Sequence, residues 1–152
     1  MQSKKRTKPD PKYQDLIVAK FVNYVMHNGK KSVAQTIVHG AIAELDKKSN
    51  GKGLELFHKA LENVGPMLEV RSKRIGGANY QVPIEVTRER KIALAMRWMI
   101  DAARSQKGVS MITRLSKELD SASKGEGLAI KKKEDTHRMA EANRAFAHFA
   151  KM

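Results

Sequence analysis

The sequence predicts a mainly α-helical protein, with a single six-helix domain and a protruding two-stranded β-hairpin between the third and fourth helices. Three observations support this fold class. The length of 152 residues suits one domain. Apolar residues recur at helical spacing along most of the chain, whereas at about residues 68–87 their period changes from 3.6 to 2. No period of 20–50 residues is repeated, so a solenoid is not expected.

Residues 1–12 are predicted to form a flexible basic N-terminal arm, and residues 13–152 the helical domain. The arm contains five cations, one acid and two prolines, with almost nothing to bury. It is therefore expected to stay extended until it meets a partner. No apolar stretch follows its basic start, so no signal peptide is expected.

The first two helices are predicted from their apolar stripes and their ends. The first lies between Pro11 and Asn28, where an Asn-Gly pair favours left-handed backbone. The second is expected to start at Ser32, because Ser32 and Gln35 have the spacing of a capping box. It is expected to end at the next Asn-Gly pair, which starts at Asn50.

The third helix is predicted over residues 54–64, and the Gly-Pro pair that follows blocks its continuation. Alternating apolar and polar residues on both sides of Gly76 and Gly77 then predict the hairpin, because two glycines supply the positive φ of a tight turn. Pro83 cannot donate a ladder hydrogen bond, which favours a two-stranded ribbon with a free edge. The ribbon base is expected to lean on the helices and its tip to project.

Three further helices complete the domain. The fourth is expected to run from an N-cap at Thr87 to a break at residues 105–108. The fifth is expected over residues 111–122, with Ser110 as its N-cap. The sixth is expected to open with the lysines of residues 131–133 and to continue through Phe146 and Phe149.

The charge indicates a polyanionic partner. Thirty Lys and Arg against sixteen Asp and Glu give a formal net charge of +14 and a pI of about 10.1. Residues 1–14 hold five cations and one acid, and residues 71–91 hold six cations and two acids, so these segments carry eight of the fourteen net charges. A third group, Lys131–Lys133 with Arg138 and Arg144, opposes the dipole of the sixth helix unless phosphates compensate it.

Basic groups on three separate elements favour RNA, which proteins recognise through phosphates, 2′-hydroxyls and unstacked bases. Tyr80 near the hairpin tip is expected either to stack on a base or to buttress its strand. A DNA-bending protein is the main alternative, but its apolar wedge would have to be Ile75. A membrane surface is disfavoured, because the cations do not line one face of an amphipathic helix.

No catalytic residue, metal ligand or cofactor site is predicted. The chain has no Cys, which excludes disulfides, zinc-thiolate sites and cysteine nucleophiles. Its five His lack metal-binding spacing, and no phosphate-binding loop or nucleophile elbow occurs. His39 and His58 are expected to be ordinary residues at the core edge. An RNA-modifying enzyme would have to use Glu134, Asp135 and His137, which are better explained as the first turn of a helix.

Three motifs carry a family resemblance: residues 28–31 (NGKK), 76–83 (GGANYQVP) and 139–148 (MAEANRAFAH). Together, and over essentially the whole chain, they resemble small-subunit ribosomal protein seven of the bacterial and organellar type. The resemblance implies a primary binder of small-subunit ribosomal RNA, without catalytic activity, that nucleates assembly of the three-prime domain, the head. It also implies a monomer on the small ribosomal subunit, in the cytoplasm or an organelle, without a membrane partner.

The resemblance further implies the site residues and neighbours. RNA contacts are expected from the arm, the loop after the first helix, the hairpin base and the fourth and sixth helices. These contacts, with the last two added from charge alone, are Lys4, Lys5, Arg6, Lys8, Lys30, Lys31, Arg71, Lys73, Arg74, Arg88, Arg90, Lys91, Lys131, Lys132, Lys133, Arg138 and Arg144. The hairpin tip is expected near the exit-site transfer RNA and the messenger RNA exit, with small-subunit proteins nine and eleven as neighbours. The tip residues are Ile75, Gly76, Gly77, Ala78, Asn79 and Tyr80.

Overall fold

The computed structural model describes residues 6–152, so the predicted RNA contacts Lys4 and Lys5 lie outside the described residues. The predicted fold class is confirmed, because the described chain is mainly helical and carries one antiparallel hairpin between its third and fourth helices. The elements in chain order are α1 (Leu16–Val25), α2 (Lys31–Ser49), α3 (Gly53–Val64), β1 (Leu68–Ile75), β2 (Ala78–Glu85), α4 (Arg88–Ser105), α5 (Met111–Ser123), α6 (Leu128–Ala142) and the 3₁₀ helix η1 (Arg144–Lys151).

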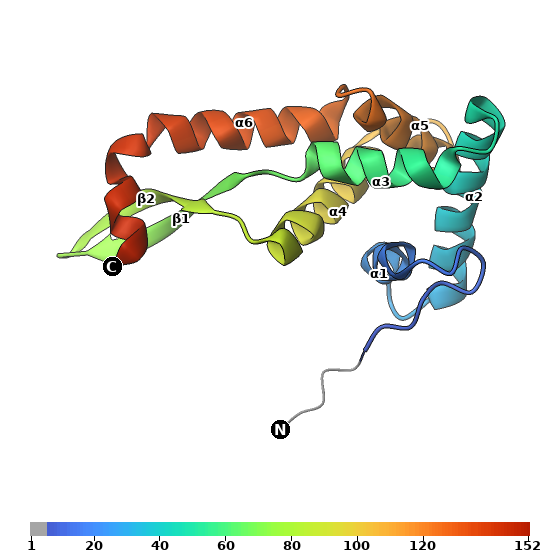
Figure 1. Cartoon of the computed structure of the whole chain (residues 1–152), viewed down its shortest axis with the longest axis horizontal. Helices are drawn as coiled ribbons and strands as arrows, with labels where there is room; N and C mark the ends of the chain where they lie inside the picture. The colour runs from blue at the N-terminus through green and yellow to red at the C-terminus, as the bar shows by residue number, and fades with distance from the viewer. Residues whose placement is uncertain (1–5) are drawn as a thin grey trace.

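The molecule is elongated, with a helical body at one end and the hairpin at the other. Figure 1 shows the hairpin extending away from α3 and α4, with α6 running alongside it and η1 folded back onto it. The helices α1 and α2 lie at the opposite end of the long axis (Figure 1). Among the described helices, none is long and apolar enough to cross a membrane.

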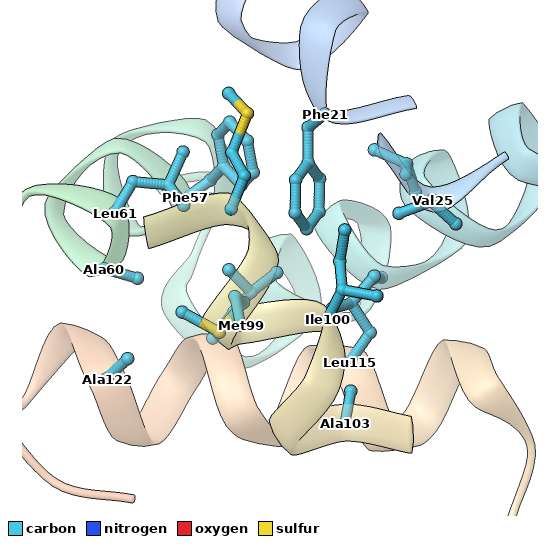
Figure 2. Packing of buried hydrophobic residues seen from close by; sticks show 14 of the residues in the cluster. Phe21, Val25, Phe57, Ala60, Leu61, Met99, Ile100, Ala103, Leu115 and Ala122 are labelled. Carbon is cyan, nitrogen blue, oxygen red and sulfur yellow. The ribbon is translucent and has the colours of Figure 1, made fainter. Parts of the chain in front are cut away.

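A single apolar core contains side chains from all five helices α1, α2, α3, α4 and α5 and from the first turn of α6. Figure 2 shows Phe21 of α1 and Phe57 of α3 near its centre, with ring centroids 5.2 Å apart, and Met99 of α4 close by. Leu115 of α5 is also fully buried, and Ile130 of α6 reaches the same core. This core makes the helical body rigid, and the hairpin extends from it.

The first two helices are capped differently from each other. Asp15 caps α1 by accepting the backbone N–H of Val18 at 2.9 Å. The capping box predicted at Ser32 and Gln35 is wrong, because α2 begins at Lys31 and has no side-chain cap. The chain has already turned in the loop before α2, where Asn28 has a φ of 52°. The backbone N–H of Ala34 donates to the carbonyl of Lys30, so the helical hydrogen bonds begin before Ser32.

The hairpin has the predicted position and turn. Its register runs from Leu68 opposite Glu85 to Ile75 opposite Ala78. Gly76 and Gly77 have φ values of 58° and 86°, so both central turn residues occupy the left-handed region, as a two-residue hairpin turn requires. Pro83 is buried in the two-stranded ribbon, where its missing N–H faces no third strand.

The predicted N-caps of α4 and α5 are confirmed. Thr87 Oγ1 accepts the N–H of Arg90 at 3.3 Å, and Ser110 Oγ accepts the N–H of Thr113 at 3.4 Å. Each hydroxyl satisfies an N–H that the first helical turn leaves without a backbone partner.

The sixth helix is shorter than predicted. It ends at Ala142, and the rest of the expected helix is the 3₁₀ helix η1. A 3₁₀ helix has three residues per turn, which places residues i and i+3 on one side. Phe146 and Phe149 are therefore aligned, and both pack against Tyr80 of β2. Contact with the hairpin explains the change of helix type.

Candidate nucleic-acid interface

Within the predicted N-terminal arm, Asp10 is held against the helical domain by hydrogen bonds. Asp10 is 2% exposed, and its carboxylate accepts the backbone N–H groups of Lys12 and Tyr13. Its Oδ1 lies 2.8 Å from Nε2 of His39 in α2. Burial raises the pKa of Asp10, but the hydrogen bonds from His39 and Tyr13 outweigh it and lower the pKa below 3.8. Composition alone could not reveal that the single acid of a basic segment docks on a helix.

Two expected RNA contacts that precede Asp10 lie close to a third expected contact at the start of α2. Arg6 and Lys8 line a surface hollow of about 520 Å³ together with Lys31 at the start of α2. Residues 23 and 25 positions apart in the chain therefore contribute positive charge to one concave surface. Concave basic surfaces concentrate anions, because they focus the electrostatic field.

At the hairpin base, one buried acid organises two of the expected cations. The side chain of Glu69 in β1 is 11% exposed. Its carboxylate accepts hydrogen bonds from Nε and Nη2 of Arg71 and from Nε and Nη2 of Arg90 in α4. The shortest of these contacts is 2.7 Å. Burial raises the pKa of Glu69, and hydrogen bonds from Arg71 and Arg90 outweigh it, so the pKa falls below 4.5.

Glu69 therefore fixes both guanidinium groups and joins the hairpin to α4. The side chains of Arg71 and Arg90 are still 55% and 37% exposed, so each keeps a surface for another ligand. Sequence reasoning missed this organising role. A signal was present, because Glu69 and Arg71 lie two positions apart on one face of a strand.

Arg88 and Lys91, at the start of α4, line a second hollow of about 530 Å³ beside the same hairpin base. Arg88 is exposed and Lys91 is half-buried. The structure thus brings the expected contacts of residues 88–91 close to those of β1, as the sequence predicts from their placement around the ribbon.

Lys73 has a different environment from Arg71 and Arg74, the other expected RNA contacts on β1. Its Nζ donates to the backbone carbonyls of Phe149, Ala150 and Met152 at 3.1–3.3 Å. Tyr80 is covered by Phe146 and Phe149, at centroid distances of 5.2 and 4.9 Å. Of the two roles expected for Tyr80, the structure supports the buttressing role.

The hairpin tip is left open beyond this cover. Gly76, Gly77, Ala78 and Asn79 are exposed, and Ile75 is half-buried. Arg74 opposite Asn79 is also exposed. The tip is thus a small turn without a large apolar side chain at its apex, which disfavours the wedge that DNA bending requires.

Helix α6 presents its cations in two ways. Lys131 and Lys132 are exposed, whereas Lys133 Nζ donates to the carbonyl of Asn63 at 2.8 Å and so caps the last turn of α3. Arg138 pairs with Asp135, and Arg144 pairs with Glu141. These last two pairs join exposed side chains three positions apart, so they leave the arginines accessible.

His137 ties α6 to the hairpin base. Its Nε2 accepts the backbone N–H of Met67 at 3.0 Å, which requires that nitrogen to be unprotonated. Burial, followed by the charge of Lys133, lowers the pKa of His137 below 6.5. This contact, like those of Glu69, sets the hairpin direction relative to the helical body.

The expected cations fall into two sets within residues 6–152. One set, described above, is held by carboxylates or carbonyls. The other set is exposed and has no side-chain ion pair or hydrogen bond among the described residues. Its members are Arg6, Lys8, Lys30, Lys31, Arg74, Arg88, Lys131 and Lys132, and the half-buried Lys91 likewise has no such partner.

The histidines and acids do not form a metal centre in the described part of the chain. His39 and His58 instead bond to Asp10 and Asp15, the latter pair at 2.7 Å. Both contacts join the N-terminal region to helices of the core. Their role at the core edge agrees with the sequence analysis.

Comparison with known proteins gives a consistent result. The family described as ribosomal protein S7p/S5e matches residues 1–144. The chain is 57% identical to the small ribosomal subunit protein uS7 of Mesorhizobium japonicum. The alignment spans 146 residues, which are 96% of this chain and 94% of the relative. With the same coverage the chain is 56% identical to the protein of that name from Brucella anthropi and 55% identical to that from Brucella canis.

Proposed function

The chain belongs to the ribosomal protein S7p/S5e family, and from this premise we propose that it is a structural, RNA-binding component of the small ribosomal subunit. The relatives carry the name of a ribosomal protein and not of an enzyme. The proposed ligand is the ribosomal RNA of the three-prime domain, and the proposed role is to nucleate assembly of the head.

The proposal rests on one observation, that many of the expected RNA-contacting cations are exposed and have no partner within the described part of the protein. Eight expected RNA contacts are exposed and unpaired among the described residues, although acids elsewhere in the chain do pair with cations. A protein that carries +14 and leaves such cations uncompensated gains free energy when a polyanion supplies the missing charge. Their placement on the N-terminal segment, the start of α2 and the loop before it, the hairpin, α4 and α6 suits a folded RNA with several helices.

The mechanism follows from this geometry. Lys and Arg side chains replace counterions condensed on the phosphates, and the released ions favour binding at low salt. The single core keeps the helical body rigid, while Glu69 and His137 fix the hairpin to it. RNA helices that repel each other are then held at fixed relative positions by one protein surface.

The same proposal includes the position of the hairpin tip on the small ribosomal subunit. The exposed tip at Gly76 to Asn79 would lie near the exit-site transfer RNA and the messenger RNA exit, and small-subunit proteins nine and eleven would be neighbours. The lack of a large side chain at the tip supports this position, because such a turn can approach another RNA closely.

Chemical footprinting tests the primary-binding role. The protein is added alone to folded three-prime-domain RNA, and backbone protections are mapped by hydroxyl radicals. Protections clustered at a junction of several helices, without any other protein present, are expected. Protections that form only after other small-subunit proteins have bound would contradict a nucleating role, and their absence under all conditions would overturn the proposed function.

A further inference from the structure

The hollow beside the hairpin base, here called the hairpin-base hollow, has an apolar floor formed by Ile17 of α1, Leu61 of α3 and Ile92 of α4. Its volume of about 530 Å³ lies within the range of about 300–1,000 Å³ that is typical of sites for small organic molecules. We infer that this hollow receives a single unpaired nucleobase extruded from the bound RNA. The inference rests on the proposed RNA-binding function and extends it to one subsite.

The rim of the hollow has the charge that a nucleotide requires. Arg88 and Lys91, from the first turns of α4, line it and can hold the phosphate that flanks the base. The start of a helix adds partial positive charge on the same side. The stem of Lys91 is packed in place, because a Cβ on Gly65 would lie only 2.5 Å from its Cγ.

Met67 gives the hollow an apolar side chain that folding does not explain. Its backbone is tied on both sides, since its N–H donates to His137 Nε2 and its carbonyl accepts the N–H of Val86. Its side chain nevertheless is 66% exposed. A thioether held at the edge of an apolar floor provides a polarisable surface against which a flat base can pack.

Polar groups on α3 suit the edge of a base. Nε2 of His58 lies 2.7 Å from Asp15 Oδ2, so this hydrogen bond orients the imidazole, whose side chain is 42% exposed. Glu62, one helical turn further on, lines the same hollow and offers a carboxylate that can accept an exocyclic amine. An apolar floor, a cationic rim and one acceptor together match a nucleotide better than a purely apolar protein side chain or a lipid.

Methyl NMR on the full chain in complex with folded three-prime-domain RNA tests the inference. The probe is the ε-methyl group of Met67, with the methyl groups of Val109, a 55% exposed valine in the loop before α5, as the internal reference. Ring currents from a packed base are expected to shift the Met67 signal by several tenths of a ppm, and an RNA duplex of equal length without unpaired bases is expected to leave it unshifted.

Affinity measurements with two matched variants complete the test. Met67→Ala removes an exposed side chain and leaves the backbone contacts, so the fold is retained. We expect roughly five- to tenfold weaker RNA binding with an unchanged salt slope, because no phosphate contact is lost. Val109→Ala, at an exposed position in the loop before α5, is expected to bind like the parent protein.

The outcomes separate the subsite from the proposed function. If the parent protein prefers the folded RNA, while the Met67 methyl does not shift and Met67→Ala binds normally, the hollow holds no base and the inference fails alone. A shift that appears only when other small-subunit proteins are added would assign the hollow to a protein side chain. If the parent protein does not prefer the folded RNA, the proposed function itself fails.

Discussion

At the scale of single residues, three polar side chains determine how the basic surface is arranged. Asp10 anchors the N-terminal segment on His39, Glu69 joins β1 to α4, and His137 joins α6 to Met67. Each lies between elements that the core alone does not hold together. None is a catalytic group. Their effect is to fix positively charged elements relative to each other before RNA binds.

The substitution Glu69→Gln tests the role of the hairpin-base acid. It keeps the size of the side chain but removes the charge that both arginines share. We expect the free energy of unfolding at pH 7 to fall by about 1–2 kcal/mol, a value discounted because the arginines are partly exposed. Urea denaturation monitored by circular dichroism measures the change.

The difference in free energy of unfolding between the parent protein and Glu69→Gln is expected to depend on pH. The pKa of Glu69 is lowered in the folded protein, so its stabilisation is present above 4.5 and is lost as pH falls through the folded value. The gap between Glu69→Gln and the parent protein should therefore shrink at low pH. Glu85→Gln, an exposed acid on the same hairpin, is the matched control. An equal loss of stability in the control would refute a specific role for Glu69.

His137 predicts a second pH effect. Because its folded pKa lies below 6.5, its stabilisation is present above pH 6.5 and is lost as pH falls toward the folded pKa, where the proton displaces the Met67 N–H. The variant His137→Gln keeps an acceptor but cannot titrate in this range. It should lose less stability between pH 7.5 and 5.5 than the parent protein.

The parent protein and His137→Gln share all other histidines. The difference between their losses of stability on acidification therefore reports on His137. The same substitution at exposed His27 is the control for loss of an imidazole. Identical pH dependence of the parent protein and His137→Gln would show that the Met67 contact does not contribute.

At the scale of elements, the helices and the hairpin follow from local patterns that the sequence displays directly. The period of apolar residues, the capping residues Thr87 and Ser110 and the pair Gly76-Gly77 act within a few positions of the chain, and all four residues have the predicted roles. The pattern did not reveal η1, because its conformation depends on contacts between Phe149 and a strand that is distant in the chain.

The same limit applies to the environments of the expected RNA contacts. The pairing of Lys73 and Lys133 cannot be predicted from spacing, because their partners lie 70 or more positions away in the sequence. Lys73 reaches the carbonyl of Phe149, and Lys133 reaches that of Asn63. The types of residue and the elements that carry them could be predicted, whereas the pairing required the three-dimensional arrangement.

The cover that η1 gives to the hairpin is testable at this scale. The change Phe149→Ala removes one ring from Tyr80 but leaves the backbone carbonyls that Lys73 binds. Amide hydrogen exchange in β2 is expected to become about two- to tenfold faster, because one aromatic contact contributes about 0.5–1.5 kcal/mol. Exchange in α2 should stay unchanged.

Lys151→Ala, at an exposed position of η1, is the control for that experiment. Unchanged exchange in β2 after Phe149→Ala would mean that η1 does not stabilise the hairpin. Equal acceleration in α2 would indicate global destabilisation instead of local opening.

At the scale of the whole molecule, one core supports basic groups that are spread along the long axis. The hollow with Arg6, Lys8 and Lys31 belongs to the α1 and α2 end, and Arg74 lies on the hairpin at the other end (Figure 1). Such an elongated distribution suits several RNA helices more than one DNA groove. The net charge and its segments were visible in the sequence, but their separation along one rigid body was not.

A charge-matched pair of variants tests this distribution. Substitution of Lys30, Arg74, Lys131 and Lys132 by Ala should lower the slope of log affinity against log salt by about 3, at roughly 0.7–0.9 per lost phosphate contact. The control removes four other exposed lysines, Lys47, Lys48, Lys117 and Lys151, and so has the same net charge. Equal slopes for the two variants would show that net charge alone governs binding.

The most direct measurement is an equilibrium titration of the purified protein against folded three-prime-domain RNA and against duplex DNA of equal length, each at two salt concentrations. Binding that favours the folded RNA and keeps this preference at the higher salt is the predicted result. Equal binding to both nucleic acids, lost to the same extent as salt rises, would contradict it and leave only a general affinity for polyanions.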